Sequence, residues 1–589
     1  MKIKSFLRFT SYVLCALTFL PFLMGANELR GGGCSPLPAP ASTVTVTPSG
    51  DGHESFTPDS PQTILQGATQ AFTLTANAGY VISYSVGGTC PTGAWTDSSY
   101  TTGAITSSCT VVFSANNANP PWYPSLNAFE HYDSGRSHLF SQASFAGDFT
   151  GNNSIDILSP ATSYPSVYNM TYIDADHIYA YGGGYGDQVG SIGAFVAQVD
   201  PDTLEALWYT QLVNTSVSGE WDYPGVMGIL EDGYLYVVYG YRLSKLDPAT
   251  GDVITTLELP TGNALPENTS YNGFDATVNG VLVMKTLYRQ AGCGVQGPEA
   301  LLNCPDPSDV PASVLVSVNP QAMTVLDEIT LPSTLLSKVT VGTYNHQNYA
   351  YLFGTSSWLR YSVSNAGELN LDTSWNPGAL LIAGQTPGSA LLVMNDWVIG
   401  QSNSTPGSEE LSLIAVSQAD ALTQFSVQPF VGDSIPSDIE NAFLFAGPGG
   451  SAAVSWMPAP VSADPEKNLI YTMDALPGEV AAYSLSSTGF NLVWKVDQRS
   501  TESIAIIGSE SERIIVGTDI PSTPTQQIPG NNSNDSVVWR NAANGSEIAR
   551  SDLLPQITPA SMVQPYYSGD MFYPGLLGNL YKLIPASTP

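Results

Sequence analysis

Three stretches of the chain repeat one pattern, in which a short turn joins two apolar segments. They are residues 196–212, 243–259 and 315–331, and an Asp-Pro or Asn-Pro pair begins each turn. Asp and Asn side chains bond backbone amides in turns and Pro fixes φ at the next position, so each stretch predicts a strand, a tight turn and a second strand. Units of this kind that recur along a chain are typical of repeat architectures.

Weaker copies continue the pattern to the end of the chain. They lie at residues 359–363, 413–417, 481–485 and 537–540, and a last strand follows at residues 579–583. Their spacing is close to the span of one four-stranded propeller blade. Eight anchors favour eight blades, with seven as the alternative, and the short intervals leave no room for βαβ crossovers.

The last copy is too short to supply a whole blade. Only residues 584–589 follow Leu583, so the strand that should come next is missing. We expect a strand upstream of the first copy, with residues 154–158 as the candidate, to complete the last blade and close the ring, because closure leaves no exposed sheet edge. The sequence therefore predicts an all-β chain with a small N-terminal β module, residues 44–116, and a closed β-propeller, residues 128–589.

The best copy carries a family resemblance. Residues 232–238 (DGYLYVV) and 243–251 (LSKLDPATG), with Trp208, Trp494 and Trp539 near the position where the repeat often places Trp, resemble the pyrroloquinoline-quinone-like repeat, a propeller repeat of the same kind as the WD40-like and YVTN-like repeats. That family includes quinoprotein dehydrogenases, outer-membrane assembly scaffolds and noncatalytic secreted propellers. The resemblance therefore implies a fold and not an activity.

The N-terminal module resembles a second family. Segments 71–76 and 80–86 alternate apolar and polar residues as strands do. Glycines, aromatic residues and cysteines fall in the order of the bacterial repeat domain related to the internalin B-repeat and Listeria-Bacteroides repeat families; the matching residues are Gly67, Gly79, Tyr80, 87–91, 100–106 and 109–113. The resemblance implies a surface or spacer module of secreted proteins.

The first residues predict export. Lys2, Lys4 and Arg8 precede an apolar run over residues 12–24, which is typical of a signal peptide over residues 1–26 and too short for a comfortable membrane span. An uncleaved anchor is the alternative. We expect a periplasmic, cell-surface or extracellular protein with no transmembrane domain in the mature chain. Two segments without periodicity, residues 27–43 and 117–127, are predicted to be linkers.

The cysteines agree with an oxidising compartment. Cys90 and Cys109 fall in one segment and Cys293 and Cys304 bracket one loop, so two local disulfides are expected. Cys34 follows the signal, which raises the question of a lipid anchor. A lipobox wants an aliphatic residue three positions earlier and this chain has glycine there, so a free or intermolecularly paired thiol is favoured.

Charge excludes some partners. The chain has 51 acidic and 18 basic residues, a formal charge of -33, which repels nucleic acid phosphates and anionic lipids. A protein, a glycan or a small anionic ligand remains as the expected binding partner. Lys285, Tyr288 and Arg289 stand just before the Cys293–Cys304 loop, where basic residues are otherwise rare, and they predict a local site for an anionic group.

Residues 147–158 (GDFTGNNSIDIL) are the metal candidate. They resemble the calcium loop of the integrin-type FG-GAP repeat, in which oxygen side chains at alternate positions wrap a hard cation. The resemblance makes Asp148, Thr150, Asn152 and Asp156 the ligands. Thr and Asn stand where Asn and Asp are usual, so two carboxylates remain and calcium would bind weakly. An Asx-rich turn before a strand is the favoured alternative.

A histidine pair stands just before this loop. His131 and His138 flank a polar stretch in EHYDSGRSH, at a spacing that matches no zinc pattern. We expect a polar loop at the entry to the propeller, with both histidines among the candidates for ligand binding.

Enzymes of the quinoprotein type would need more than the fold. The resemblance would require a vicinal Cys-Cys pair, a Trp floor under the quinone and an Asp base beside a calcium shell, and this chain has no adjacent cysteines. Bound pyrroloquinoline quinone is therefore not expected, and no catalytic residue is assigned. The sequence favours a secreted or cell-surface binding or scaffold module. The alternative is an extracellular or periplasmic enzyme on the propeller axis, either a divergent quinoprotein oxidoreductase or a carbohydrate-active lyase or hydrolase.

Overall fold

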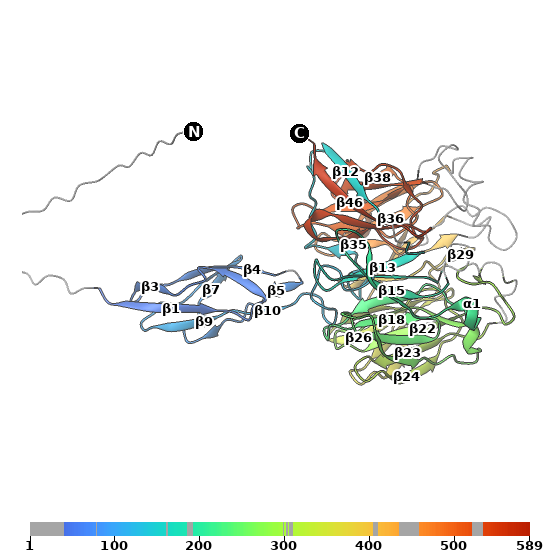
Figure 1. Ribbon diagram of the computed structural model, residues 1–589, viewed down its shortest axis with the longest axis horizontal. Coiled ribbons are helices and arrows are strands. Elements are labelled where there is room, and N and C mark those ends of the chain that lie inside the picture. The colour runs from blue at the N-terminus through green and yellow to red at the C-terminus, as the bar shows by residue number, and fades with distance from the viewer. Residues whose placement is uncertain are drawn as a thin grey trace, which may run out of the picture.

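The computed structural model shows two β-rich bodies, drawn in Figure 1 with the N-terminal module to the left of the larger region. It describes residues 41–588 except 78, 161–162, 185–191, 299, 302–303, 305–309, 405–409, 435–458 and 521–533. The predicted signal peptide and Cys34 lie outside the described residues. Strands make up nearly all regular structure, so the all-β prediction is confirmed. No described helix has the length and apolar character needed to cross a membrane.

The N-terminal module consists of two four-stranded sheets and a two-stranded ribbon. The first sheet has the order β3 (Gln62–Leu65), β1 (Thr43–Ser49), β9 (Cys109–Val112), β6 (Gly87–Gly88). The second has the order β2 (Glu54–Thr57), β4 (Ala71–Ala76), β8 (Ser99–Thr101), β7 (Ala94–Thr96), and β5 (Tyr80–Ile82) pairs with β10 (Ala115–Asn117). Inward residues alternate with exposed ones, as in β4, where Phe72 and Leu74 are buried.

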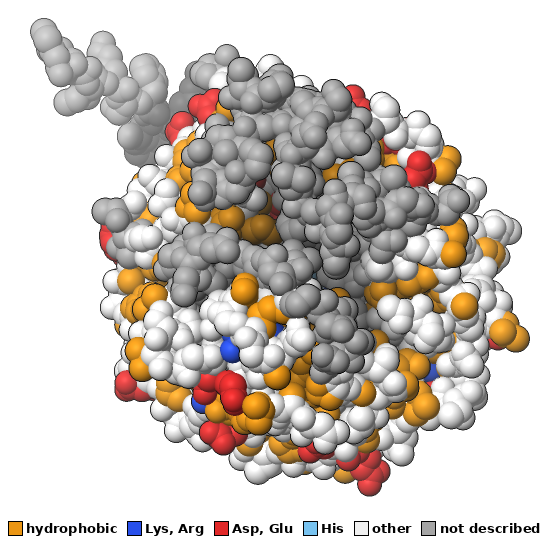
Figure 2. Space-filling view, turned by 90° about the vertical axis from the view of Figure 1, so that its right-hand side faces the viewer, with side chains coloured by type: hydrophobic (Ala, Val, Ile, Leu, Met, Phe, Trp, Pro, Cys, Tyr) orange, Lys and Arg blue, Asp and Glu red, His pale blue; other side chains and the backbone are white. Residues whose placement is uncertain are grey.

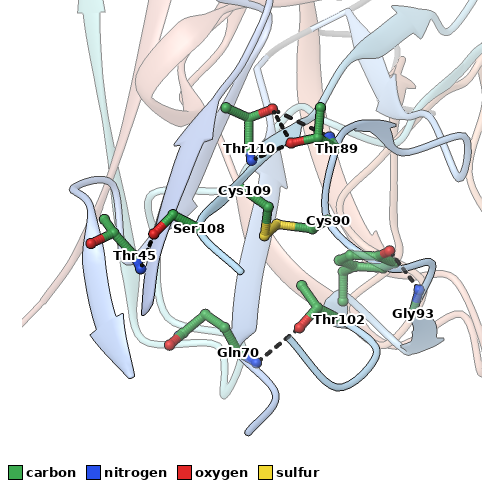
Figure 3. The surroundings of a disulfide bond; sticks show 10 residues. Thr45, Gln70, Thr89, Cys90, Gly93, Thr102, Ser108, Cys109 and Thr110 are labelled. Carbon is green, nitrogen blue, oxygen red and sulfur yellow. Dashed lines mark hydrogen bonds between the residues drawn. A yellow bond between two sulfur atoms is a disulfide. The ribbon is translucent and has the colours of Figure 1, made fainter. Parts of the chain in front are cut away.

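A disulfide joins the loop after β6 to β9. Cys90 and Cys109 are bonded, as predicted, and the hydroxyls of Thr89 and Thr110 lie 3.3 Å apart beside them (Figure 3). The backbone amide of Gly93 donates to the Tyr100 hydroxyl at 2.8 Å. The predicted second disulfide, Cys293–Cys304, is also formed.

The larger region is a succession of sheets, antiparallel apart from one short parallel pair in sheet 7, which we number 1 to 8 in chain order. Among the described residues seven have four strands and sheet 7 has six. Sheets 1 to 4 are β13 (Val167–Tyr172) to β16 (Ala206–Gln211), β17 (Val226–Ile229) to β20 (Val253–Glu258), β21 (Thr269–Ala276) to β24 (Thr324–Thr330), and β25 (Thr340–Tyr344) to β28 (Leu369–Leu371). The second and third strands are β14 (Ile178–Gly182) and β15 (Phe195–Val199) in sheet 1, and β18 (Leu235–Tyr239) and β19 (Arg242–Leu246) in sheet 2. They are β22 (Leu282–Tyr288) and β23 (Val314–Asn319) in sheet 3, and β26 (Gln347–Phe353) and β27 (Trp358–Val363) in sheet 4.

Sheets 5 to 8 follow the same plan. Sheet 5 is β30 (Leu392–Met394), β31 (Trp397–Gln401), β33 (Leu413–Ser417), β34 (Gln424–Val427), and sheet 6 is β35 (Ser462–Asp464), β36 (Leu469–Asp474), β37 (Glu479–Ser486), β38 (Gly489–Asp497). Sheet 7 contains β39 (Ala505–Ile507), β40 (Ile514–Asp519), β41 (Asn534–Asn541), β42 (Glu547–Arg550), with β11 (Leu139–Phe140) and β43 (Leu554–Pro555) added. Sheet 8 is β44 (Gln564–Pro565), β45 (Met571–Pro574), β46 (Leu580–Ser587) and β12 (Asn153–Leu158).

The repeat found in the sequence marks one position in these sheets. The three best copies form the third and fourth strands of sheets 1, 2 and 3, and the five weaker anchors fall on β27, β33, β37, β41 and β46. Gly251 closes the turn of the second copy at φ 75°, the left-handed conformation that glycine adopts without strain.

The last sheet draws its outer strand from the start of the region, as the short final copy predicts. β12 pairs antiparallel with β46, and Ile157 lies opposite Leu583. Each sheet's first strand contacts that of the next sheet, from β13 to β44, and β45 contacts β13. This order of sheets is that of a β-propeller. First strands such as β13 and β21 are buried along their whole length, whereas fourth strands such as β20 and β24 alternate, because only the inner strands are covered on both faces.

Bulky side chains on fourth strands lock neighbouring sheets together. Trp208 of sheet 1 donates from Nε1 to the Pro248 carbonyl at 3.1 Å and covers Gly251 in the turn of sheet 2. Trp494 of sheet 6 donates to the Ala542 carbonyl at 2.9 Å and covers Gly545 in sheet 7. Any side chain at either glycine would collide with the indole, so the lock needs glycine in the turn.

Replacing one lock residue tests its contribution. We expect Trp494→Ala to lower the free energy of unfolding by about 3 kcal/mol, since it removes a buried indole and its hydrogen bond. Leu492→Ala is the matched control, because Leu492 lies on the same strand but is 53% exposed. Urea denaturation of both variants checks the difference, and equal losses would contradict the lock.

Candidate functional site

Residues 124–140, which we call the axial segment, connect the N-terminal module to the propeller and run along the inner strands. Part of this stretch, up to residue 127, is predicted from sequence to be linker. In the structure these residues already bond to the propeller, since Ser125 Oγ donates to the Tyr172 carbonyl and the Tyr172 amide donates to the Asn127 carbonyl, both at 2.6 Å.

The first half of the axial segment contacts sheets 8, 1 and 2. Asn127 Nδ2 donates to the Met170 carbonyl of sheet 1 at 3.0 Å and to Gln564 Oε1 of sheet 8 at 2.7 Å. The Ile229 amide of sheet 2 donates to the Ala128 carbonyl at 2.9 Å.

The second half contacts the remaining five sheets. Three carbonyls of the segment accept inner-strand amides at 2.8–2.9 Å. The Gly135 carbonyl accepts the Val393 amide of sheet 5, the Ser137 carbonyl accepts the Ala463 amide of sheet 6, and the His138 carbonyl accepts the Ile506 amide of sheet 7. Side chains reach sheets 3 and 4, because Ser134 Oγ donates to the Ala276 carbonyl and Arg136 donates to the Val339 carbonyl just before β25. One segment thus bonds to all eight sheets at their inner edges.

A buried charged cluster lies where the axial segment meets sheets 3 and 4. Glu130 is bonded to Lys338, and its Oε2 lies 3.3 Å from Arg136 Nη1. Arg136 Nε lies 3.9 Å from Asp275 Oδ2, and Lys338 Nζ also donates to the Tyr168 hydroxyl at 2.8 Å. Arg136 and Lys338 supply the positive charge that makes the buried Glu130 carboxylate tolerable.

The two histidines extend this cluster. His131 Nε2 lies 3.0 Å from Glu130 Oε2, and His131 Nδ1 lies 2.6 Å from His138 Nε2. His138 Nδ1 is buried and has no hydrogen-bond partner in the described part of the chain. Glu130, His131 and His138 therefore form a short carboxylate–imidazole–imidazole chain, in which the 3.0 Å approach of His131 Nε2 to Glu130 is close but lacks hydrogen-bond geometry. They are 3%, 2% and 0% exposed, so this chain is sealed from solvent.

Burial and charge set the protonation of the cluster. Burial lowers the pKa of His131 to about 4 and lowers that of His138 well below its usual value. Burial by itself would raise the pKa of Glu130, but the neighbouring cationic groups hold it well below its usual value. Burial lowers the pKa of Lys338 to about 8, against the pull of Glu130, and raises that of Asp275 to about 8, against that of Arg136. At neutral pH the histidines are neutral and the Glu130–Lys338 pair is charged.

The backbone of the segment is strained where these groups sit. Tyr132, Arg136 and His138 have φ of 75°, 62° and 61°, a region that costs non-glycine residues about 1–2 kcal/mol each. The hydrogen bonds to the sheets hold these conformations and aim the side chains inward.

The sequence signalled this site only in part. His131 and His138 are brought together, but they are buried against the inner strands and do not stand in an exposed entry loop, so the predicted entry loop is corrected to a buried segment. Glu130 and Arg136 stand in the same stretch of sequence, so both could have been included among the candidate site residues. Lys338 and Asp275 carry no local signal, because only the ring places their sheets beside the segment.

The residues proposed for an anionic ligand are buried. Lys285 is 0% exposed and bonds to Asn272, and burial lowers its pKa to about 7. Tyr288 is 2% exposed. Arg289 bonds to Asn268 Oδ1 and to the carbonyls of Gly219, Glu267 and Val295. Its guanidinium ties the loop of Cys293 to the connections that precede and follow sheet 2, and only 6% of the residue is exposed.

The calcium candidate forms an Asx turn. Asp148 Oδ1 accepts the Thr150 amide at 2.8 Å and Oδ2 accepts the Thr150 hydroxyl at 2.7 Å. Asn152 and Asp156 are exposed, and Asp156 lies within β12. The described residues contain no group of three or more His, Cys, Asp or Glu that could hold a metal ion.

Comparison with known proteins concerns structure alone. No family model and no curated protein matches the chain. The structure is similar to quinohemoprotein alcohol dehydrogenase from Comamonas testosteroni, with 10% identity, TM-score 0.46 and coverage of 79% of this chain and 80% of that chain. It is also similar to a europium-containing methanol dehydrogenase, with 7% identity, TM-score 0.46 and coverage of 76% and 89%, and to the quinohemoprotein alcohol dehydrogenase ADHIIG from Pseudomonas putida HK5, with 10% identity, TM-score 0.42 and coverage of 79% and 81%.

The cysteines and Trp122 bear on two features that the family resemblance would require for a quinone. The cysteines that the structure describes are joined in two disulfides, and no two cysteines are adjacent in the sequence. Trp122, which enters the axis with the segment, is fully buried and stacks on Phe129 with ring centroids 3.9 Å apart. It therefore offers no open face as a floor for a cofactor.

Breaking the charged cluster should unfold the ring. We expect Lys338→Met to lower the free energy of unfolding by about 3–5 kcal/mol, because it leaves Glu130 buried without its closest cation. Lys467→Met is the control, since Lys467 pairs with Glu510 at the surface and its loss should change stability little. Chemical denaturation measures both, and a small loss in Lys338→Met would contradict a structural role for the pair.

Acid should destabilise the protein through the histidines. A group whose pKa is lower in the folded than in the unfolded chain binds its proton on unfolding, so stability is lost as pH falls from about 6.5 toward 4. We expect His138→Gln to be less stable at pH 7 but to show a shallower loss over this window. His177→Gln, at an exposed histidine, should keep the wild-type slope. Denaturation midpoints at pH 7, 6, 5 and 4 provide the measurement.

Proposed function

We propose that this chain is an exported binding protein, periplasmic, cell-surface or extracellular, whose eight sheets are the blades of one closed ring. In this proposal the N-terminal module is a spacer of the internalin B-repeat type, and the far face of the ring binds a partner protein. The two disulfides and the absence of a membrane-crossing helix among the described residues are compatible with export.

The observation that carries the proposal is a set of exposed aliphatic side chains, which we call the rim residues. One stands in each of five consecutive connections between sheets 1 and 6: they are Val217, Leu265, Leu336, Ile382 and Val431. They are 83%, 56%, 60%, 42% and 60% exposed. Exposed apolar side chains that recur at one place in a fold mark a binding surface more often than scattered ones do.

The rim residues share one face for a topological reason. Each connection leads from the fourth strand of one sheet to the first strand of the next, so in antiparallel four-stranded sheets all of them emerge at the same end. The N-terminal module joins the opposite end, where Asn117 Nδ2 donates to Glu231 at the turn between β17 and β18. Figure 2 shows the face away from the module, and on the part of it that the structure describes hydrophobic side chains stand among polar ones.

The chemistry of this face favours a protein with apolar and basic groups. A chain of charge -33 repels acidic partners, and aliphatic side chains offer little to a glycan. The loop of Cys293 stiffens the face, because Trp221 Nε1 donates to the Gly297 carbonyl at 3.0 Å and Gln296 bonds to Glu220 and Asp222 close to Val217.

The second candidate is an enzyme on the axis. The contact of Glu130, His131 and His138 favours it, because a carboxylate and two imidazoles within hydrogen-bond reach can move a proton. Their burial weighs against it, since a substrate would have to displace the axial segment from all eight sheets.

A matched pair of variants tests the binding face. A peptide selected on the full chain from a phage-displayed library is the probe, and we expect Val217→Ser with Leu265→Ser and Leu336→Ser to weaken its binding at least about tenfold. The control replaces Val253, Ile254 and Leu492 by serine, because these outer-strand residues are similarly exposed. Calorimetric titration measures both, and equal losses, or none in the rim variant, would contradict the proposal.

A further inference from the structure

The connection between the N-terminal module and the propeller is bonded to sheet 2. Residues 117–127 are predicted from sequence to be a linker, but part of this stretch lies against the turn between β17 and β18. The Tyr123 amide donates to the Ile229 carbonyl at 2.9 Å, and the Glu231 amide donates to the Pro121 carbonyl at 3.0 Å. This part of the chain therefore pairs with the propeller as a short strand would, and it does not run free.

The same connection is bonded to the module. The Ala118 amide donates to the Gly79 carbonyl, just before β5, at 2.9 Å. Asn117, the last residue of β10, uses its side chain on the propeller side, since Nδ2 donates to the Trp122 carbonyl at 2.8 Å and to Glu231 Oε1 at 2.6 Å. Sheet 2 is thus a first anchor for the module.

A second anchor lies beside sheet 7. Gln142 follows β11, which belongs to that sheet. The Gly79 amide donates to Gln142 Oε1 at 2.6 Å, and Gln142 Nε2 donates to the Tyr80 carbonyl at 3.4 Å. Sheets 8 and 1 stand between sheet 7 and sheet 2 in the succession of sheets, so the two anchors hold the module at separate places.

A third anchor is a close approach of two backbones. Gly79 lies against the peptide bond that joins Pro124 to Ser125, and a Cβ at Gly79 would stand 2.2 Å from the Pro124 carbonyl carbon. Ser125 is held in turn, because its Oγ donates to the Tyr172 carbonyl of sheet 1 at 2.6 Å. Only glycine fits at this contact.

We infer that the N-terminal module is a rigid arm, fixed in direction relative to the propeller, and does not swing on a linker. Three anchors at separate sheets fix both the direction and the rotation of a body, whereas a single linker fixes neither. In Figure 1 the ribbon of β5 and β10 is the part of the module next to the propeller, and the rest of the module extends away from it. The inference rests on the proposed function only for the use of such an arm, which is to hold the rim residues on the side away from the module. The junction itself needs no ligand.

Distances between spin labels test the arm in the full chain, with Cys34→Ser in every sample so that only introduced cysteines carry a label. One pair joins the two bodies, Leu65→Cys in β3 with Val278→Cys between β21 and β22. The reference pair, Val278→Cys with Leu492→Cys, lies within the propeller, and all three residues are exposed. We expect both pairs to give equally narrow distance distributions. A free linker over residues 117–123 would spread the first distance over on the order of 10 Å.

Two glycine variants test the close approach. Gly79→Val places a side chain where Pro124 lies, so we expect it to shift or widen the distribution of the first pair. Gly52→Val is the matched control in the same module and should leave the distribution unchanged. Gly52 has a φ of 93° against 81° at Gly79, but no atom lies within 4 Å of its Cβ position.

Three results would overturn the rigid arm. They are a wild-type distribution wider for the first pair than for the reference pair, no change in Gly79→Val, and an equal change in Gly52→Val. Should Gly79→Val fail to fold, the comparison of the two wild-type pairs decides. The peptide titration of the rim residues does not depend on these distances, so failure of the arm and failure of the binding face are distinguishable.

Discussion

The propeller depends on the axial segment. Residues 124–140 bond to an inner edge in every sheet, so the propeller has a peptide core beside its first strands. Inner strands on the axis present amides and carbonyls that water would otherwise have to satisfy. The axial segment bonds to some of these backbone groups, from the Met170 carbonyl of sheet 1 to the Ile506 amide of sheet 7. It couples the sheets to one another and to the N-terminal module, which precedes it directly.

The charged cluster follows from this arrangement and fixes the register of the axial segment against the sheets. Polar residues that reach the axis must be paired there, and Glu130, Arg136, Lys338 and Asp275 pair across the segment and sheets 3 and 4. A segment shifted by one residue would leave several of these charges buried and alone. The strained backbone at Arg136 and His138 indicates that the register is held against local preference.

Much of the fold could be predicted from the sequence. Every anchor falls on the third strand of a sheet, both disulfides form, and the pairing of residues 154–158 with the last strand follows from counting strands in the final copy. These features are local, since turn residues, strand alternation and short cysteine spacing act within about one blade. The candidate sites were less accessible. The sequence around Arg289 does not reveal that its guanidinium is already bonded within the protein, because the carbonyls that bind it lie on three separate loops.

The sequence by itself determined that the chain is built from repeated antiparallel strands, and it indicated export through an N-terminal apolar run. Tertiary structure alone decided what fills the ring and where charge is buried. The stretch around His131 looks like a polar loop because its residues are polar. Inside the ring each polar group meets a partner that comes from a different sheet, and no local pattern encodes that meeting.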